Sequence, residues 1–273
     1  MALHNRISTA AGAALLLALW LSSASAADVL RVGGTGGATA LLAHLGKPFT
    51  QQTGIVVEVI PSLGSGGGIN AAADGVLDFA VSGRPLSPAE TGRGLVQAAT
   101  VLTPYVLATS LRVPPGMTER EIVDAYATPR ATWPDGSVIK VILRPRAESD
   151  NQVLVSLFPG MAAALDQARR RTELPVAATD QDNADMAEAV MGSLIGTTYT
   201  QVLLEHRKLQ MIPIDGVTPT IEAFERKSYR YAKVFHIVHL RQPSAVAARF
   251  LQFLRSDEGV RSLREAGCMP GAE

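Results

Sequence analysis

Strand-like and helical patterns alternate in the first third of the sequence, and this alternation constrains the fold more than any other feature. Short runs rich in Val, Ile and Leu predict strands at 29–32, 55–60 and 78–81. Helical patterns at about 38–52 and 69–73 lie between them. The order strand, helix, strand, helix, strand predicts an α/β fold with a mainly parallel sheet flanked by helices.

A loop rich in glycine and small hydroxyl residues follows each of these three strands, at 33–37, 62–68 and 82–84. In open parallel sheets, ligands bind outside the carboxyl ends of the strands, where such loops meet. Glycines let backbone N–H groups approach a ligand, and the N-terminus of a following helix favours negative charge. One such loop is common in any α/β sheet, but three in succession predict an oxyanion-binding site. We call the three loops together the oxyanion cradle.

Side chains of the cradle add donors of their own. Thr35, Ser65 and Ser82 supply hydroxyl groups. Arg84 is close enough in sequence to supply positive charge or to clamp two parts of the molecule together.

The rest of the chain continues the mixed pattern. A long apolar stretch covers 100–111. Further strands are predicted at 138–143 and 234–240, and further helices at 118–126, 158–171, 183–190, 246–254 and 257–265, the last stopped by Gly267. No linker is long enough to separate independent domains. We therefore expect two lobes joined by crossing strands: residues 27–110 with 233–273, and residues 111–232.

The N-terminus has the layout of a secretory signal peptide. Arg6 is its only charge, an apolar run covers about 10–21, and Ala24-Ser25-Ala26 matches a cleavage site. The run is too short to span a bilayer. We expect residues 1–26 to be removed and the mature protein to lie in a bacterial periplasm.

Cysteine and charge content narrow the class further. Cys268 is the only cysteine, so no intramolecular disulfide can form, and no cysteine follows the apolar run to carry a lipid anchor. Basic and acidic residues are balanced at 25 each. This balance argues against nucleic acid or an anionic membrane as the main partner. We expect a monomer.

Catalytic and metal-binding patterns are weak. No serine lies in a G-x-S-x-G motif, and no Walker-type lysine follows the glycine loops. His236 and His239, three apart in a predicted strand, point to opposite faces. The acidic residues from Asp180 to Glu188 lack the glycine and the terminal glutamate of a calcium loop, and we expect helix capping around Asp182 and Asn183 instead. The sequence predicts no enzyme, no metal and no cofactor.

At the cradle, the sequence resembles the phosphate-binding proteins of bacterial phosphate ABC transporters, within the type II periplasmic binding proteins. The similarity runs through most of the mature chain. Its main segments are 34–37, 64–69, 78–87, 133–137 with 142–145, 214–220 and 250–259. The resemblance implies a two-lobed fold that binds phosphate or a similar oxyanion between its lobes and delivers it to a membrane permease.

The resemblance implies ligand contacts at Thr35, Gly36, Ser65 and Ser82, and at Ser149 with an arginine from the second lobe. The family usually has an arginine four residues before a Ser-Gly-Thr turn, whereas this chain has Arg144 and Arg146 before Ser149-Asp150-Asn151. A carboxylate about 4 Å from an anion costs on the order of 1 to 4 kcal/mol. The anion site would survive if Asp150 pairs with Arg144 or Arg146. The candidate ligand-binding residues are Thr35, Gly36, Gly37, Gly64, Ser65, Gly66, Ser82, Gly83, Arg84, Arg144, Arg146, Ser149 and Asn151.

Two alternatives remain open from the sequence. Glu148 and Asp150 are compatible with a periplasmic sensory or accessory protein that has the same fold, has lost tight anion binding and acts through protein contacts. A secreted hydrolase could use the same cradle for a phosphate ester, although no nucleophile and base pair is visible.

Overall fold

Strands β1 (Val29–Gly34), β2 (Val56–Ile60) and β3 (Phe79–Ser82) form the parallel part of the sheet in a computed structural model that describes residues 28–271. β1 lies between β2 and β3 and runs parallel to both. Helices α1 (Thr39–Thr53) and α2 (Gly64–Ala73) make the two crossovers. The predicted α/β fold is confirmed. The predicted signal peptide, residues 1–26, lies outside the described residues.

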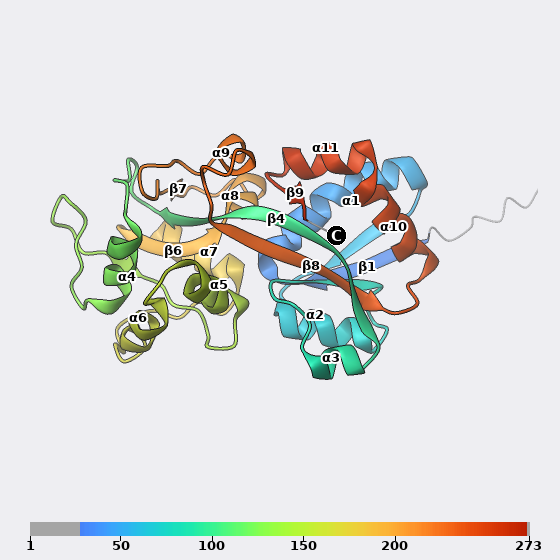
Figure 1. Cartoon of the computed structure of the whole chain (residues 1–273), viewed down its shortest axis with the longest axis horizontal. Helices are drawn as coiled ribbons and strands as arrows, with labels where there is room; N and C mark the ends of the chain where they lie inside the picture. Colours follow the sequence, from blue (N-terminus) through green and yellow to red (C-terminus); the bar gives the residue numbers. More distant parts are fainter. Residues whose placement is uncertain (1–27, 272–273) are drawn as a thin grey trace, which may run out of the picture.

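Two long antiparallel strands cross the middle of the molecule (Figure 1). β8 (Ala232–Leu240) pairs with β3 and with β4 (Leu95–Thr109). The C-terminal end of β4 pairs with β6 (Ser193–Thr198), and β6 pairs in parallel with β5 (Lys140–Val141). The short strands β7 (Gln210–Met211) and β9 (Met269–Pro270) also pair with β4. β4 therefore belongs to both halves of the molecule and connects them.

The remaining helices divide between the two halves (Figure 1). The half that contains β1 to β3 also carries η1 (Gly36–Ala38), α3 (Pro88–Gly92), α10 (Ala245–Arg255) and α11 (Asp257–Glu265). The other half carries α4 (Glu119–Ala127), α5 (Ser149–Leu157), α6 (Met161–Ala168), α7 (Asp180–Ala189), α8 (Tyr199–Leu204) and α9 (Ile221–Glu225). The segments at both ends of the described chain thus lie in the same half.

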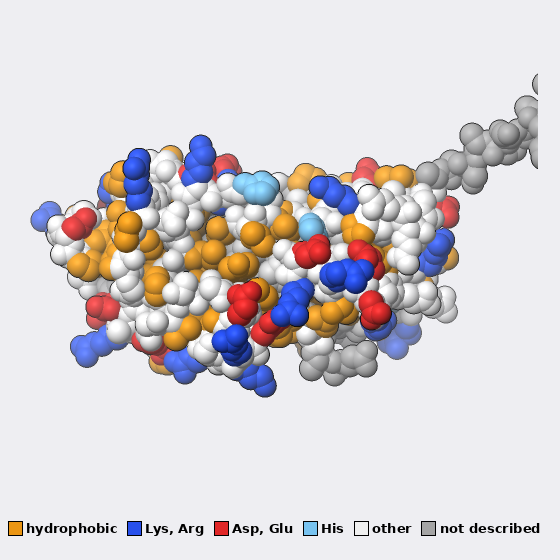
Figure 2. Space-filling model, turned by 90° about the horizontal axis from the view of Figure 1, so that it is seen from above, with side chains coloured by type: hydrophobic (Ala, Val, Ile, Leu, Met, Phe, Trp, Pro, Cys, Tyr) orange, Lys and Arg blue, Asp and Glu red, His pale blue; other side chains and the backbone are white. Residues whose placement is uncertain are grey.

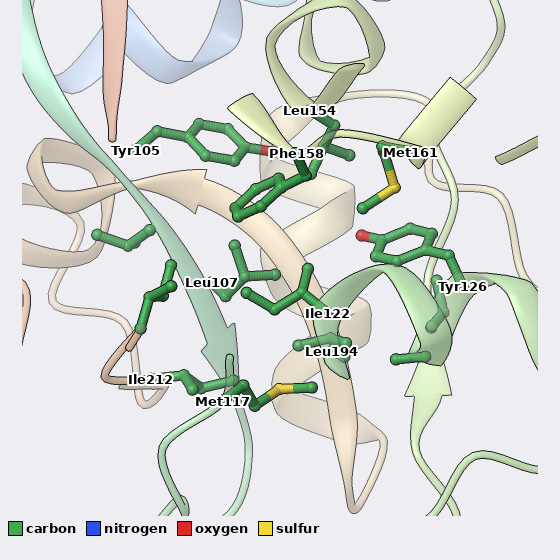
Figure 3. Packing of buried hydrophobic residues seen from close by; sticks show 14 of the residues in the cluster. Tyr105, Leu107, Met117, Ile122, Tyr126, Leu154, Phe158, Met161, Leu194 and Ile212 are labelled. Atoms are coloured by element: carbon green, nitrogen blue, oxygen red, sulfur yellow. The ribbon is translucent and has the colours of Figure 1, made fainter. Parts of the chain in front are cut away.

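Each half has its own large hydrophobic core. One core is built on α1, α10 and the neighbouring strands, and in it the ring of Phe250 contacts those of Phe49 and Phe79. The other contains Tyr105, Leu107, Ile122 and Tyr126 among its buried residues, as Figure 3 shows. The first core takes Val101 from β4 and the second takes Tyr105, so the cores meet along this strand. We refer to the half that contains β1 to β3 as lobe 1 and to the other half as lobe 2. Their predicted boundaries, at residues 110/111 and 232/233, stay a prediction.

Several elements of lobe 2 differ from the sequence-based prediction. The strand expected at 138–143 is reduced to Lys140–Val141, and the helix expected at 158–171 is α6, preceded by a separate helix α5. Helix α7 begins at Asp180 and has Thr179 as its N-cap; the expected capping role is confirmed for Asp182, whereas the Asn183 side chain donates to the carbonyl of Gly196. Thr179 and Asp182 form a capping box, which satisfies N–H groups that the helix itself cannot.

The surface is of mixed character. Figure 2 shows basic and acidic side chains interspersed on the visible face, with hydrophobic side chains gathered over the lobe 2 half. Among residues 28–271, no helix is long and apolar enough to cross a membrane.

Candidate ligand-binding site

The three loops of the oxyanion cradle come together at the carboxyl ends of β1, β3 and β2. Gly34 at the end of β1 has a φ of +136°, and a Cβ atom there would lie 2.0 Å from the carbonyl oxygen of Val81 in β3. Only glycine allows this close approach. The amide of Thr35 then donates to the same carbonyl at 2.8 Å. The first and third loops are thereby held side by side.

The second loop is not a loop over its whole predicted length. Helix α2 begins at Gly64, so Gly64 to Gly68 form its first turns, whereas the sequence predicted helix only from residue 69. Glycine disfavours helix, but Ile69 and Ala72 are buried and hold the helix against the sheet. A Cβ on Gly68 would lie 2.6 Å from the Cα of Gly34. Glycine at this position lets α2 pack directly on β1.

The three hydroxyl residues of the cradle are buried. Ser65 and Ser82 are 8% and 0% exposed, and Thr35 is 4% exposed. The Ser65 Oγ accepts a hydrogen bond from the amide of Gly83 at 2.9 Å and so connects the second and third loops. The Ser82 Oγ accepts from the Arg84 amide and donates to the Arg84 carbonyl within the third loop. Ser65 and Ser82 thus stabilise the loops, and the binding roles predicted for all three residues stay predictions.

Lobe 2 meets the cradle through the first turn of α5. Ser149, Asp150 and Asn151 begin this helix and are all buried. A Cβ on Gly83 would lie 2.5 Å from the Ser149 Oγ, so the two lobes are in direct contact at this point. Close contact also occurs at Gly36, where a Cβ would lie 2.6 Å from the Asp180 Oδ2.

Arg144 is the buried arginine of the site. It is 5% exposed, and its guanidinium donates to the carbonyl oxygens of Ala177 and Thr179. Three carboxylates surround it, at 3.4 Å for Glu148, 3.7 Å for Asp150 and 3.6 Å for Asp180. Arg144 is thus the arginine that lies between the lobes.

Lys233, at the start of β8, is a second buried cation and is 1% exposed. Its ammonium group pairs with Asp150 and lies 4.0 Å from Asp180. Burial lowers the pKa of Lys233, but attraction to Asp150 and Asp180 outweighs it and the pKa is raised. Burial raises the pKa of Asp150, but Lys233 and Arg144 outweigh burial, so the pKa lies below its usual value. Asp150 and Lys233 form a stable ion pair between the lobes.

Asp180 differs from Asp150 in its protonation. Burial raises its pKa to about 6, and the negative charge of Asp150 adds to this shift. Lys233 and Arg144 oppose the shift without cancelling it. The site therefore contains one firmly ionised carboxylate and one that takes up a proton in mildly acidic solution.

Three other candidate residues have partners away from this region. Arg84 forms a salt bridge with Glu90, which also caps α3. Arg146 is exposed and pairs with Asp166 at 3.2 Å. The Asn151 side chain donates to the Pro145 carbonyl and accepts from Arg169. The roles predicted for these three residues stay predictions, and the structure gives each another function in stabilising its own lobe.

A small cavity remains between the lobes, with a volume of about 80 Å³. It is lined by Gly36, Ser62, Leu63, Gly64, Arg144, Glu148, Ala178, Thr179 and Asp180. A single water molecule needs roughly 10 to 15 Å³ of such volume, so the cavity has room for a small polyatomic ligand. Both lobes therefore line the cavity, with Arg144 as its only basic residue.

Lys233 and Asp180 belong to the site but are not among the residues predicted from the sequence. Lys233 is a lone charge in the otherwise apolar run 231–235, which is an unusual pattern for a strand of the core and could have served as a signal. Asp180 looked like one of several helix-capping acids. Its position between the lobes depends on tertiary packing and leaves no trace in the local sequence.

The histidines of β8 lie on opposite faces, as expected from their spacing. The imidazole of His236 hydrogen-bonds with Gln97, and that of His239 contacts the carbonyl of Leu240. Within residues 28–271, no group of three or more His, Cys, Asp or Glu side chains is arranged to hold a metal ion.

Comparisons with known proteins identify the class to which this arrangement belongs. The sequence matches the family model described as PBP superfamily domain over residues 21–258, and the chain belongs to this family. No curated protein matches the sequence. A mixed sheet flanked by helices, in two lobes joined by crossing strands, is the fold of type II periplasmic binding proteins.

Several solved structures share the fold at low sequence identity. One is a protein from Clostridium perfringens that is described as a substrate-binding protein of a phosphate ABC transporter and was solved with bound phosphate. Its TM-score is 0.77 at 17% sequence identity, and the match covers 90% of this chain and 100% of that chain. An ABC-type phosphate transport receptor from Vibrio cholerae has a TM-score of 0.60 at 17% identity, covering 88% and 99%. A phosphate-binding protein from Stenotrophomonas maltophilia has a TM-score of 0.66 at 14% identity, covering 90% and 91%.

Proposed function

We propose that this protein is a periplasmic solute-binding protein that captures phosphate or a similar small oxyanion between its lobes for an ABC transporter. The three solved structures named above are phosphate-binding or phosphate-transport proteins by their descriptions. The proposal includes action as a monomer without catalytic activity, with a membrane permease as partner. The structural matches do not favour the alternative sensory role.

The observation that carries the proposal is the cavity of about 80 Å³ between the cradle and Arg144. On the lobe 1 side, Gly64 lies at the N-terminus of α2, where backbone N–H groups and the helix dipole favour an anion. On the lobe 2 side, the guanidinium offers the planar set of donors that suits phosphate and related oxyanions. A hinge motion at β4 and β8 would open the site to solvent.

The carboxylates of Glu148 and Asp180 line the same cavity and reduce its attraction for anions. Because the pKa of Asp180 is raised to about 6, this repulsion weakens as the pH falls from 7 to 5. Sulfate keeps its charge over this range, whereas phosphate loses part of its own. We therefore expect sulfate to bind more tightly at pH 5 than at pH 7.

A thermal-shift screen with phosphate, sulfate, molybdate, tungstate and small organic acids tests the proposal. A ligand at a hundred times its dissociation constant should stabilise the protein by about 2.7 kcal/mol, which corresponds to roughly 5 to 10 °C. Arg144→Lys keeps the charge but loses the planar donors, so it should reduce the shift. Arg31→Lys, which changes an exposed arginine paired with Glu58, is the matched control. The absence of a shift with every oxyanion at both pH values would reject the proposed function.

A further inference from the structure

A cluster of five charged side chains lies between the lobes, and its carboxylates outnumber its cations. Arg144 and Lys233 face Glu148, Asp150 and Asp180 within 4.0 Å. Four of the five side chains are less than 10% exposed, and Glu148 is 27% exposed. The two cations that could neutralise a bound anion are therefore already neutralised by the protein itself.

Glu148 and Asp180 line the cavity between the cradle and Arg144, and Asp150 pairs with Arg144 and Lys233. A Cβ on Gly37 would lie 3.5 Å from the Asp180 Oδ1 and 3.8 Å from the Lys233 Nζ. A Cβ on Gly83 would lie 3.3 Å from the Lys233 Cε. Two loops of the cradle thus contact the lysine and its counter-ions directly.

The ion pair also joins α5 of lobe 2 to the crossing strand β8. Asp150 belongs to α5, whereas Lys233 is the second residue of β8 and lies 5.9 Å from the ring of Phe235 in the core of lobe 1. Buried charges are tolerated when they are paired and are costly when they are not. With Asp150 in place, the empty cleft can close on a neutralised lysine. Without it, closure would bury Lys233 with only the more distant Asp180 as partner.

We propose that Asp150 acts as an internal counter-ion: it competes with the ligand for Lys233 and Arg144, holds the empty cleft closed, and lowers the affinity for anions. An oxyanion binds by displacing this carboxylate from the two cations. The inference rests on the proposed function only for the identity of the competing ligand.

The affinity part of the proposal is tested with Asp150→Asn and inorganic phosphate as the probe, by isothermal titration calorimetry on the full mature chain. The amide has the shape of the carboxylate but no charge, so the two cations become available to phosphate. The variant should bind phosphate at least tenfold more tightly than the parent protein. A purely structural role for Asp150 would instead predict unchanged or weaker binding. Asp74→Asn, which removes an exposed partner of Arg93, is the control and should leave the affinity unchanged.

The conformational part is tested by small-angle X-ray scattering, which needs no mutation for its first comparison. The parent protein should have the same radius of gyration with and without phosphate. Asp150→Asn should be expanded without phosphate and contract when phosphate is added. Contraction of the parent protein on adding phosphate would overturn the proposal, and so would a variant that stays compact without phosphate and binds it no more tightly.

The two proposals can fail separately. If neither the parent protein nor Asp150→Asn binds phosphate, but the variant alone is expanded, the conformational part of the proposal is supported, whereas its affinity part for phosphate and the proposed function are rejected. If Asp150→Asn does not fold, the comparison of the parent protein with and without phosphate still decides the conformational part.

Discussion

At the scale of single residues, Asp180 shows how burial and neighbouring charge determine protonation. Arg144 and Lys233 face its carboxyl group on one side, and Glu148 and Asp150 add negative charge. Burial is the largest influence on its pKa, which is raised to about 6. The folded protein thus binds this proton more tightly than the unfolded chain does, so folding stability from this group falls as the pH rises from about 4 to about 6.

Replacing Asp180 with Asn should remove this pH dependence. The stability of Asp180→Asn relative to the parent protein should increase between pH 4 and pH 7, by on the order of 1 to 3 kcal/mol. Asp150 acts in the opposite direction: because its pKa is lowered in the folded protein, its ionised form stabilises the fold, and this stabilisation is lost only when the pH falls below about 4. Urea unfolding at several pH values measures the difference, with Asp166→Asn as a surface control. Parallel pH profiles for Asp180→Asn and the parent protein would contradict the raised pKa.

At the scale of secondary structure, α2 is a helix whose glycines have different surroundings. A Cβ on Gly68 would meet the backbone of Gly34 at 2.6 Å, whereas a Cβ on Gly66 would have no atom within 4 Å. The two residues lie in the same helix and can receive the same substitution. They therefore separate the effect of helix propensity from that of packing.

Gly68→Ala should destabilise the protein by about 1 to 3 kcal/mol, because α2 must move away from β1 to make room for the methyl group. Gly66→Ala should be neutral or stabilise by up to about 1 kcal/mol, since alanine favours helix and the position is open. Urea unfolding of both variants gives the comparison. Equal effects of the two substitutions would mean that α2 does not pack on β1 as closely as described.

At the scale of the whole molecule, β4 and β8 run through both halves and should couple their unfolding. Trp133 is buried in the core of lobe 2, where its indole N–H donates to the carbonyl of Gly192. It is the only tryptophan in residues 28–271, so its fluorescence reports on lobe 2. Phe250 is buried in the other core, against Phe49 and Phe79.

Phe250→Ala should cost about 3 to 5 kcal/mol, because it leaves a cavity among aromatic rings of lobe 1. If the two cores unfold together, the fluorescence transition of Trp133 should shift as much as the transition followed by circular dichroism. Leu203→Ala, at an exposed position of α8 in lobe 2, is a control with little expected effect. A fluorescence transition that does not move in Phe250→Ala would show that the lobes unfold independently.

The local pattern of the sequence determined the fold class and much of the cradle. Alternating strands and helices, and glycine and hydroxyl residues at strand ends, depend on interactions between residues close in the chain. For this reason β1, α1, β2 and β3 fall within one or two residues of their predicted ranges. The sequence also singled out Thr35, Ser65 and Ser82, which are buried in the structure, although their predicted role as donors to an anion stays a prediction.

Only the tertiary structure decided which charges meet. Arg144 and Arg146 are two residues apart in the sequence, yet the first is buried between the lobes and the second is paired on the surface. Lys233 and Asp150 are 83 residues apart and form an ion pair because the crossing strand β8 passes the first turn of α5. Charge interactions act through space and their strength depends on burial, so a sequence shows which ions are present but not which of them are brought together away from water.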